Sequence, residues 1–150
     1  MQKREDSVAY YIFNCAGGDA AKGSTLRERA AELLRLRMWG VEDGETHRSS
    51  LAPHDLVLIY LGAPLREFIG RAELASAAHE WTTPEALEYP GAAPGGVLLT
   101  QVEEWDPPVA MARVLSRVDR AEGARADFEN GVVRITANEF ETAVAVARRT

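Results

Sequence analysis

The chain has 150 residues, a hydrophobic fraction of 46% and a formal net charge of −6. These values predict one globular domain, residues 1–150, with its own core. No run reaches the roughly 18 apolar residues of a membrane span, and the acidic balance works against non-specific attraction to phosphates. Cys15 is the single cysteine, which excludes an internal disulfide. We therefore expect a reduced, cytoplasmic protein that does not associate with membranes.

The first third of the chain predicts a strand, a helix and a second, short extended segment. The run 8–15 is short and rich in aromatic and β-branched residues, as strands are. Apolar residues recur with helical spacing over 25–37, and Thr25 with Glu28 has the spacing of a capping box. Trp39 follows directly, with Gly40 as an end signal. We expect Trp39 to lie on an exposed rim at this junction.

Two apolar runs in the middle of the chain, 56–61 and 68–74, predict a pair of antiparallel strands joined by a turn with Gly62 and Pro64. The second run alternates, and one face should carry Phe68, Gly70, Ala72 and Leu74. Gly70 leaves room there for another backbone, a ring or a ligand, or it marks a bulge.

An irregular connection over 75–96, rich in proline and glycine, contains Trp81. Long loops in compact domains are often functional. The next run, 97–105, predicts a strand that Pro107 and Pro108 should stop.

The remaining elements complete an α+β domain. We expect a helix over 109–118, a loose charged segment over 119–127, a strand over 131–135, and a last helix opened by a capping box of Thr136 and Glu139. About four or five strands with peripheral helices predict a small curled or barrel-like sheet.

Residue patterns for catalysis are missing from the sequence. His47, His54 and His79 lack the spacing of metal ligands, and one cysteine cannot form a zinc cluster. There is no nucleophile elbow, Walker loop or dinucleotide-binding loop. Glu103 and Glu104 are adjacent, so in a strand they point to opposite faces and cannot act as an acid–base pair. We predict a protein that is not an enzyme and that holds no metal or cofactor.

Aromatic residues offer a different chemistry. Tryptophan can sandwich a flat ring or attract a cation through its π face. The three tryptophans are Trp39, Trp81 and Trp105, and a buried core position is the alternative for each of them. We assign Trp105 to the structure of the domain.

The order of several short motifs resembles that of an EVE domain, a member of the PUA-like superfamily that also includes the YTH and ASCH domains. The motifs are Y-I-F-N-C, M-W-G-V, L-A-P-H-D-L-V-L-I-Y and F-I-G-R-A-E-L, with Arg48 in a polar loop between the second and third. The resemblance covers about residues 8–147 and implies a small PUA-like mixed β-barrel with flanking helices. This sequence has His54-Asp55 where the family usually has glycine-aspartate.

EVE domains are similar to proteins that read modified bases in DNA or RNA. The resemblance of this chain to an EVE domain therefore implies a pocket for an extruded base. By this resemblance, Trp39 matches the aromatic wall of the family's pocket. Asn14 and Cys15 match the end of the strand where polar groups read the base edge, and Arg48 matches a loop arginine that contacts phosphate. The expected base pocket is Asn14, Cys15, Trp39, Gly40 and Trp81, and the expected nucleic-acid backbone contacts are Lys22, Arg48 and Arg71.

The function predicted from this likeness is non-catalytic recognition of a modified base, in restriction and defence or in RNA modification, with partner proteins of a restriction system. One alternative is a small ASCH-like amidohydrolase acting on a modified nucleoside. The ASCH-type pattern G-x-K-x-x-E is missing, and the lysines are Lys3 and Lys22. A second alternative is a protein-interaction module that uses the arginine-rich helix 25–37.

Overall fold

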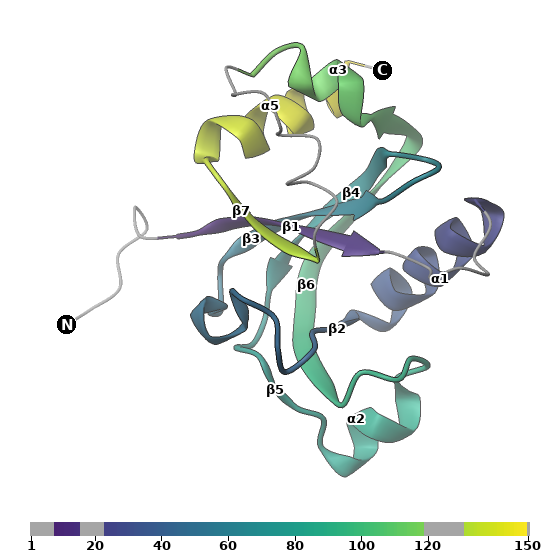
Figure 1. Cartoon of the computed structure of the whole chain (residues 1–150), viewed down its shortest axis with the longest axis vertical. Helices are drawn as coiled ribbons and strands as arrows, with labels where there is room; N and C mark the ends of the chain where they lie inside the picture. Colours follow the sequence, from purple (N-terminus) through teal and green to yellow (C-terminus); the bar gives the residue numbers. More distant parts are fainter. Residues whose placement is uncertain (1–7, 16–22, 119–130, 150) are drawn as a thin grey trace.

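A curled mixed sheet with helices against both of its faces forms the described part of the chain, residues 8–15, 23–118 and 131–149 of a computed structural model (Figure 1). The elements, in chain order, are β1 Tyr10–Cys15, α1 Gly23–Leu36, β2 Met38–Gly40, the 3-10 helix η2 Arg48–Ser50, β3 Leu56–Leu61, β4 Glu67–Leu74, β5 His79–Glu80, α2 Thr83–Glu88, β6 Gly95–Ala110, α3 Met111–Leu115, β7 Val132–Ile135 and α5 Ala137–Arg148.

The strands lie in the order β2-β6-β4-β3-β1-β7, and β5 pairs with β6. The predicted antiparallel pairing of β3 with β4 is confirmed, whereas β1 runs parallel to β3. At 16 residues, β6 is long enough to pair with β4 along one part and with β2 and β5 along another. The predicted α+β class and curled sheet are confirmed.

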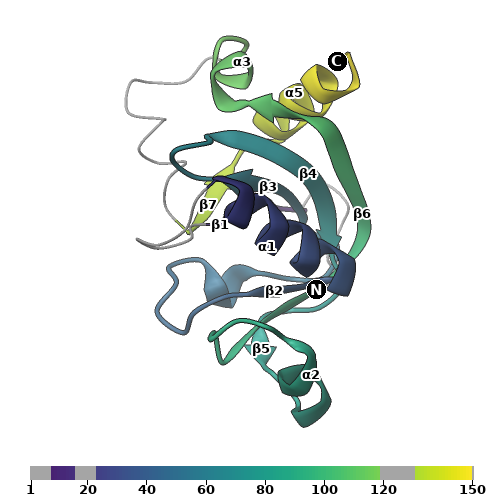
Figure 2. The ribbon, with the colours of Figure 1, turned by 90° about the vertical axis from the view of Figure 1, so that its right-hand side faces the viewer.

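Each face of the sheet carries its own core. Side chains alternate along β1, so Tyr11, Phe13 and Cys15 join the core beneath α1, while Ile12 joins the core beneath α3 and α5. Figure 2 shows α1 lying across one face of the curled sheet, with α3 and α5 at the far end. A strand covered on both faces reads as a continuous apolar run, which explains the composition of β1.

Gly70 marks a bulge at which another backbone approaches closely. A Cβ on Gly70 would overlap the carbonyl oxygen of Glu103 on β6, and the pairing register shifts at this point. The predicted strict alternation of β4 is therefore wrong. Phe68 faces the α5 core, whereas Ile69, Ala72 and Leu74 face the α1 core, because a bulge moves the residues on its two sides out of phase.

Pro107 and Pro108 do not end β6, contrary to the prediction. The register between β4 and β6 jumps from Gly70 opposite Glu104 to Phe68 opposite Val109, so residues 105–108 face a single residue of β4. Proline is tolerated in this stretch because it lies outside the regular hydrogen-bond ladder. The helix predicted to follow is shorter than expected and covers only Met111–Leu115.

The two predicted capping boxes have different outcomes. At α5, Thr136 Oγ1 accepts the Glu139 N–H at 3.1 Å and Glu139 Oε1 accepts the Thr136 N–H at 2.8 Å, as predicted. Thr25 instead lies inside α1, because this helix begins at Gly23 and the same spacing also fits one turn of a helix interior. The charged segment predicted over 119–127 lies outside the described residues.

Asp55 ties the start of β1 to the turn before β3. This residue is 1% exposed. Its Oδ1 accepts the Ala9 N–H and its Oδ2 accepts the Ala52 N–H, both at 3.0 Å. The preceding residue, His54, has φ of 78°, a conformation that favours glycine. This backbone angle explains why glycine would fit at position 54.

Candidate functional site

A cavity of about 590 Å³ lies at the carboxyl end of β1. Its walls come from β1, α1, β2 and the residues after it, the segment 89–93 and the start of β7. Asn14, Cys15, Trp39 and Gly40 all line it, so four of the five residues predicted for a base pocket lie together. The volume falls within the range of about 300–1,000 Å³ that is common for small-molecule sites.

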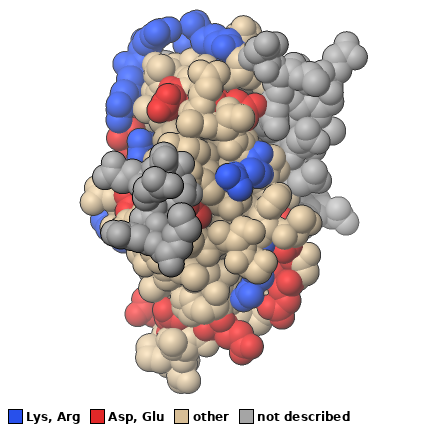
Figure 3. Space-filling view, turned by 90° about the vertical axis from the view of Figure 1, so that its left-hand side faces the viewer, with Lys and Arg blue, Asp and Glu red and all other residues tan. Residues whose placement is uncertain are grey.

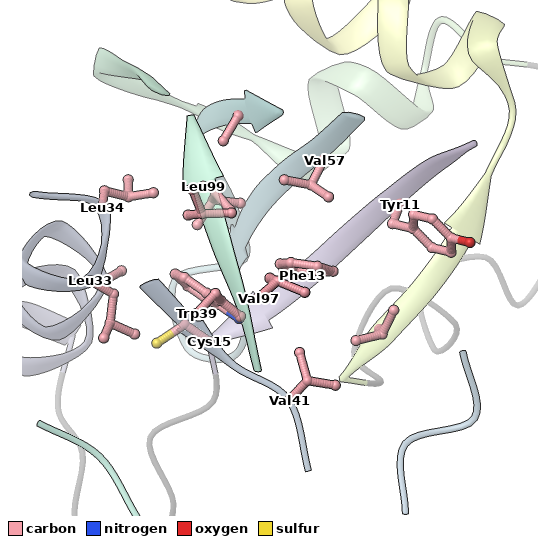
Figure 4. Close-up of a cluster of buried hydrophobic side chains, with 14 of the residues drawn as sticks. Tyr11, Phe13, Cys15, Leu33, Leu34, Trp39, Val41, Val57, Val97 and Leu99 are labelled. Carbon is pink, nitrogen blue, oxygen red and sulfur yellow. The ribbon is translucent and has the colours of Figure 1, made fainter. Parts of the chain in front are cut away.

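Trp39 reaches this cavity from the core. Its side chain lies 6.2 Å from Phe13 between ring centroids, at an interplanar angle of 27°, and the residue is 5% exposed. Figure 4 shows the indole among Phe13, Cys15 and Val97. The expected exposed rim position is wrong, because β2 pairs with β6 through Trp39 opposite Val97, which turns the indole inward. The indole still borders the cavity beside Asn14 and Cys15.

Tyr89, which the sequence analysis did not select, is the second aromatic residue lining the cavity. Trp81 does not line it and instead packs behind Tyr89, at 4.9 Å between ring centroids. The Trp81 Nε1–H donates to the Ala93 carbonyl at 3.0 Å, which holds the segment 89–93 in place. Pro90 and Gly91, which follow Tyr89, are typical of a turn. This was the signal in the sequence that could have identified Tyr89 as a residue presented by a turn.

Gly40 lets the Tyr89 phenol approach the backbone of β2. A Cβ at this position would overlap the Tyr89 hydroxyl and would lie 2.8 Å from the Cβ of Ala93. Burial raises the pKa of the Tyr89 hydroxyl. A hydrogen bond from the Gly40 N–H lowers this pKa, and the charge of Glu42 raises it further. The hydroxyl is therefore protonated at neutral pH and can donate a hydrogen bond to a ligand.

Cys15 contributes a neutral thiol to the same wall. Burial raises the pKa of this thiol, and the nearby charge of Arg29 opposes that shift. Since the thiolate is the nucleophilic form, this cysteine acts as an apolar surface.

Of the residues predicted to bind a nucleic-acid backbone, the two that the structure describes, Arg48 and Arg71, do not line the cavity. Arg48 binds the Val41 carbonyl at 3.4 Å and Asp43 at 3.7 Å. Arg71 lies 5.0 Å above the Phe140 ring and lines a second groove, of about 420 Å³, beside α5. Bulge geometry at Gly70 and the packing of α5 place Arg71 on the face opposite α1. Lys22 lies outside the described residues.

Acidic side chains predominate near the cavity instead. Glu42 and Glu45 line it together with Arg29. An adjoining groove of about 340 Å³ shares Arg29 and adds Glu28 and Glu32 from α1. The side of the molecule away from α1 has a charge pattern of its own. Figure 3 draws this side: acidic side chains gather toward the lower end, where Figure 1 places β5 and α2, and basic ones toward the upper end.

His79 fastens the segment that carries Tyr89. Its Nδ1 lies 3.0 Å from the Ala77 carbonyl and its Nε2 lies 3.0 Å from Glu85 Oε1, so both ring nitrogens face acceptors. Only the doubly protonated imidazole can donate to both. The Ala77 hydrogen bond is the main cause that raises the pKa of His79; burial lowers it, Glu85 raises it further and the charge of Arg48 lowers it.

We expect His79→Ala to lower the free energy of unfolding more at about pH 5.5 than at about pH 8.5. A raised pKa in the folded state means that the stabilisation is fully present below the ordinary histidine pKa and disappears as pH rises through the folded value. Denaturant unfolding of both proteins at the two pH values measures this difference. An equal loss at both values would contradict it, and His54→Ala, which removes a more exposed histidine, is the control.

In the described residues, no group of three or more His, Cys, Asp or Glu side chains is arranged to hold a metal ion. No helix in the described ranges is long and apolar enough to cross a membrane.

Comparison with known proteins identifies the fold. No protein-family model and no curated protein matches the chain. A hypothetical protein from Leishmania major matches with a TM-score of 0.65 at 16% identity, over 97% of this chain and 98% of that one. The YTH domain-containing protein mmi1, solved with RNA, matches with a TM-score of 0.59 at 13% identity, over 96% of this chain and 86% of that one.

An ASCH protein from Zymomonas mobilis also matches, with a TM-score of 0.54 at 10% identity, over 92% of this chain and 95% of that one. The chain therefore has the PUA-like fold shared by ASCH and YTH domains, as predicted. At these identities the likeness concerns the fold, and membership of the EVE family stays a prediction.

Proposed function

We propose that the chain is a non-catalytic reader that holds one modified base, extruded from DNA or RNA, in the cavity at the end of β1. The observation that carries this proposal is the meeting of Asn14, Cys15, Trp39 and Gly40 with Tyr89 around one space. A YTH protein of the same fold was solved with RNA, which supports the choice of ligand.

The cavity has the components that recognition of a base requires. A base that stacks on an aromatic ring gains about 1–3 kcal/mol. A single added methyl group contributes only about 0.8 kcal/mol by burial. Discrimination therefore depends on shape and on polar groups that a wrong base would leave unpaired. The Asn14 amide and the protonated Tyr89 hydroxyl provide donors and acceptors at this wall.

In this proposal, contacts to phosphate contribute little to the binding affinity, because the charged residues around the cavity are mainly acidic. The base itself supplies the affinity.

We place the protein in restriction and defence or in RNA modification, with proteins of a restriction system as partners. The amidohydrolase alternative predicts turnover of acetylated cytidine by the purified protein, and the interaction-module alternative predicts binding of a protein through α1.

We expect Tyr89→Ala to weaken binding of a modified nucleoside by about tenfold or more, since it removes one aromatic wall. A calorimetric screen of the full chain against modified and unmodified nucleosides and oligonucleotides measures the affinity. Tyr10→Ala is the matched control, because Tyr10 lines the second groove beside α5. Equal affinities of Tyr89→Ala and the unchanged protein would contradict the proposal.

A further inference from the structure

The charge of the cavity restricts what can bind there. Among the described charged side chains that line it, Arg29 is the single cation, opposed by the carboxylates of Glu42 and Glu45. The adjoining groove adds two more carboxylates, those of Glu28 and Glu32, and no further cation from the described part of the chain. An anionic group inside the cavity would meet like charge, whereas a cationic ring is attracted.

Glu45 is held at the wall by the fold. Its Oε1 accepts the Val132 N–H at 2.9 Å, which links the residues after β2 to the start of β7. A Cβ on Gly131 would lie 2.7 Å from its Oε2, so the carboxylate is closely packed against this backbone. Glu45 is half-buried, and its charge is therefore a fixed part of the cavity, less screened than that of a free surface side chain.

Aromatic residues complete the same environment. Trp39 and Tyr89 both border the space, and each is backed by another ring, Phe13 behind Trp39 and Trp81 behind Tyr89. Aromatic rings attract cations, more strongly when water is excluded. Carboxylates together with aromatic rings are the chemistry that binds a planar cation, while a neutral base uses only the stacking surface.

Building on the proposed function, we infer that the modified base is one that is a cation at neutral pH because it is methylated on a ring nitrogen. Methylation of adenine at N1 or of cytosine at N3 gives such a base. It is planar, it is cationic, and its exocyclic amino group can donate to a carboxylate. The added charge, more than the added methyl group, then separates the modified base from the unmodified one.

Calorimetric titration of the full chain with matched nucleosides tests this inference. The pairs are 1-methyladenosine with adenosine and 3-methylcytidine with cytidine; N6-methyladenosine and 5-methylcytidine are methylated but neutral. At neutral pH, we expect the cationic nucleosides to bind at least tenfold more tightly than either neutral class. Added salt should reduce this preference.

Glu45→Gln and Glu42→Gln should each reduce the preference for the cationic nucleosides severalfold, because they remove the charge and keep the shape. The amide introduced by Glu45→Gln keeps a carbonyl oxygen that can accept the Val132 N–H, so the fold should persist. Glu141→Gln, in the second groove, is the control and should leave the preference unchanged.

Two negative results have different meanings. If neutral methylated nucleosides bind as well as cationic ones, and Tyr89→Ala abolishes both, the inference about charge is overturned and the proposed reader function stands. If no nucleoside or oligonucleotide binds, or binding is indifferent to Tyr89→Ala, the reader function and the inference are both wrong.

Discussion

Asp55→Ala is expected to lower the free energy of unfolding by about 3 kcal/mol. The Asp55 carboxylate accepts two backbone hydrogen bonds, from Ala9 and from Ala52, and the residue is 1% exposed. Hydrogen bonds to a charged acceptor are worth about 1.5–3 kcal/mol each, and buried N–H groups without an acceptor are costly. Urea unfolding followed by circular dichroism measures the change.

Glu73→Gln is the control for this prediction. It removes the charge of a carboxylate whose Oε2 lies 2.9 Å from Nδ1 of His54, and the His54 side chain is exposed. An exposed pair contributes only about 0–1 kcal/mol. Similar losses for Asp55→Ala and Glu73→Gln would show that the buried carboxylate does not hold β1 against the turn before β3.

Gly96→Ala is expected to cost about 2–3 kcal/mol of stability and to weaken binding in the cavity. Gly40 and Gly96 are paired between β2 and β6, and a Cβ on Gly96 would overlap the carbonyl oxygen of Trp39. The added methyl group must displace β2. That movement carries Trp39 and Gly40 away from their positions at the cavity wall.

Thermal unfolding and nucleoside titration of Gly96→Ala measure the two effects. Gly44→Ala is the matched control, because a Cβ at Gly44 would have no atom within 4 Å. We expect this variant to change stability by less than about 0.5 kcal/mol and to bind as the unchanged protein does. If Gly96→Ala is as stable as Gly44→Ala, the close contact between β2 and β6 is not a constraint.

Local patterns predicted the elements whose signals are complete within a short stretch. The paired runs 56–61 and 68–74 became β3 and β4, and Thr136 with Glu139 became the cap of α5. Gly70 was identified as a place for a bulge or a close approach because a strand rarely has glycine inside it without such a reason.

Features that depend on pairing between distant strands were not predictable in this way. Trp39 is buried because Val97 lies opposite it, and Tyr89 reaches the cavity because Trp81 and Ala93 hold its segment. The prolines of β6 remain inside a strand because residues 105–108 face a single residue of β4 and so lie outside the regular ladder. The positions of Trp39 and of the prolines depend on strands far away in the sequence, whereas that of Tyr89 depends on the path of an irregular connection, which no local pattern specifies.

The position of β1 between β3 and β7 sets an order of assembly. β1 precedes the other described elements in the chain, yet one of its neighbours, β7, consists of residues 132–135. The Asn14 N–H also donates to the Gly131 carbonyl at 2.8 Å. Contacts between distant segments form late because closing a long loop costs entropy. During translation, we therefore expect the cavity wall beside Asn14 to remain open until β7 has left the ribosome.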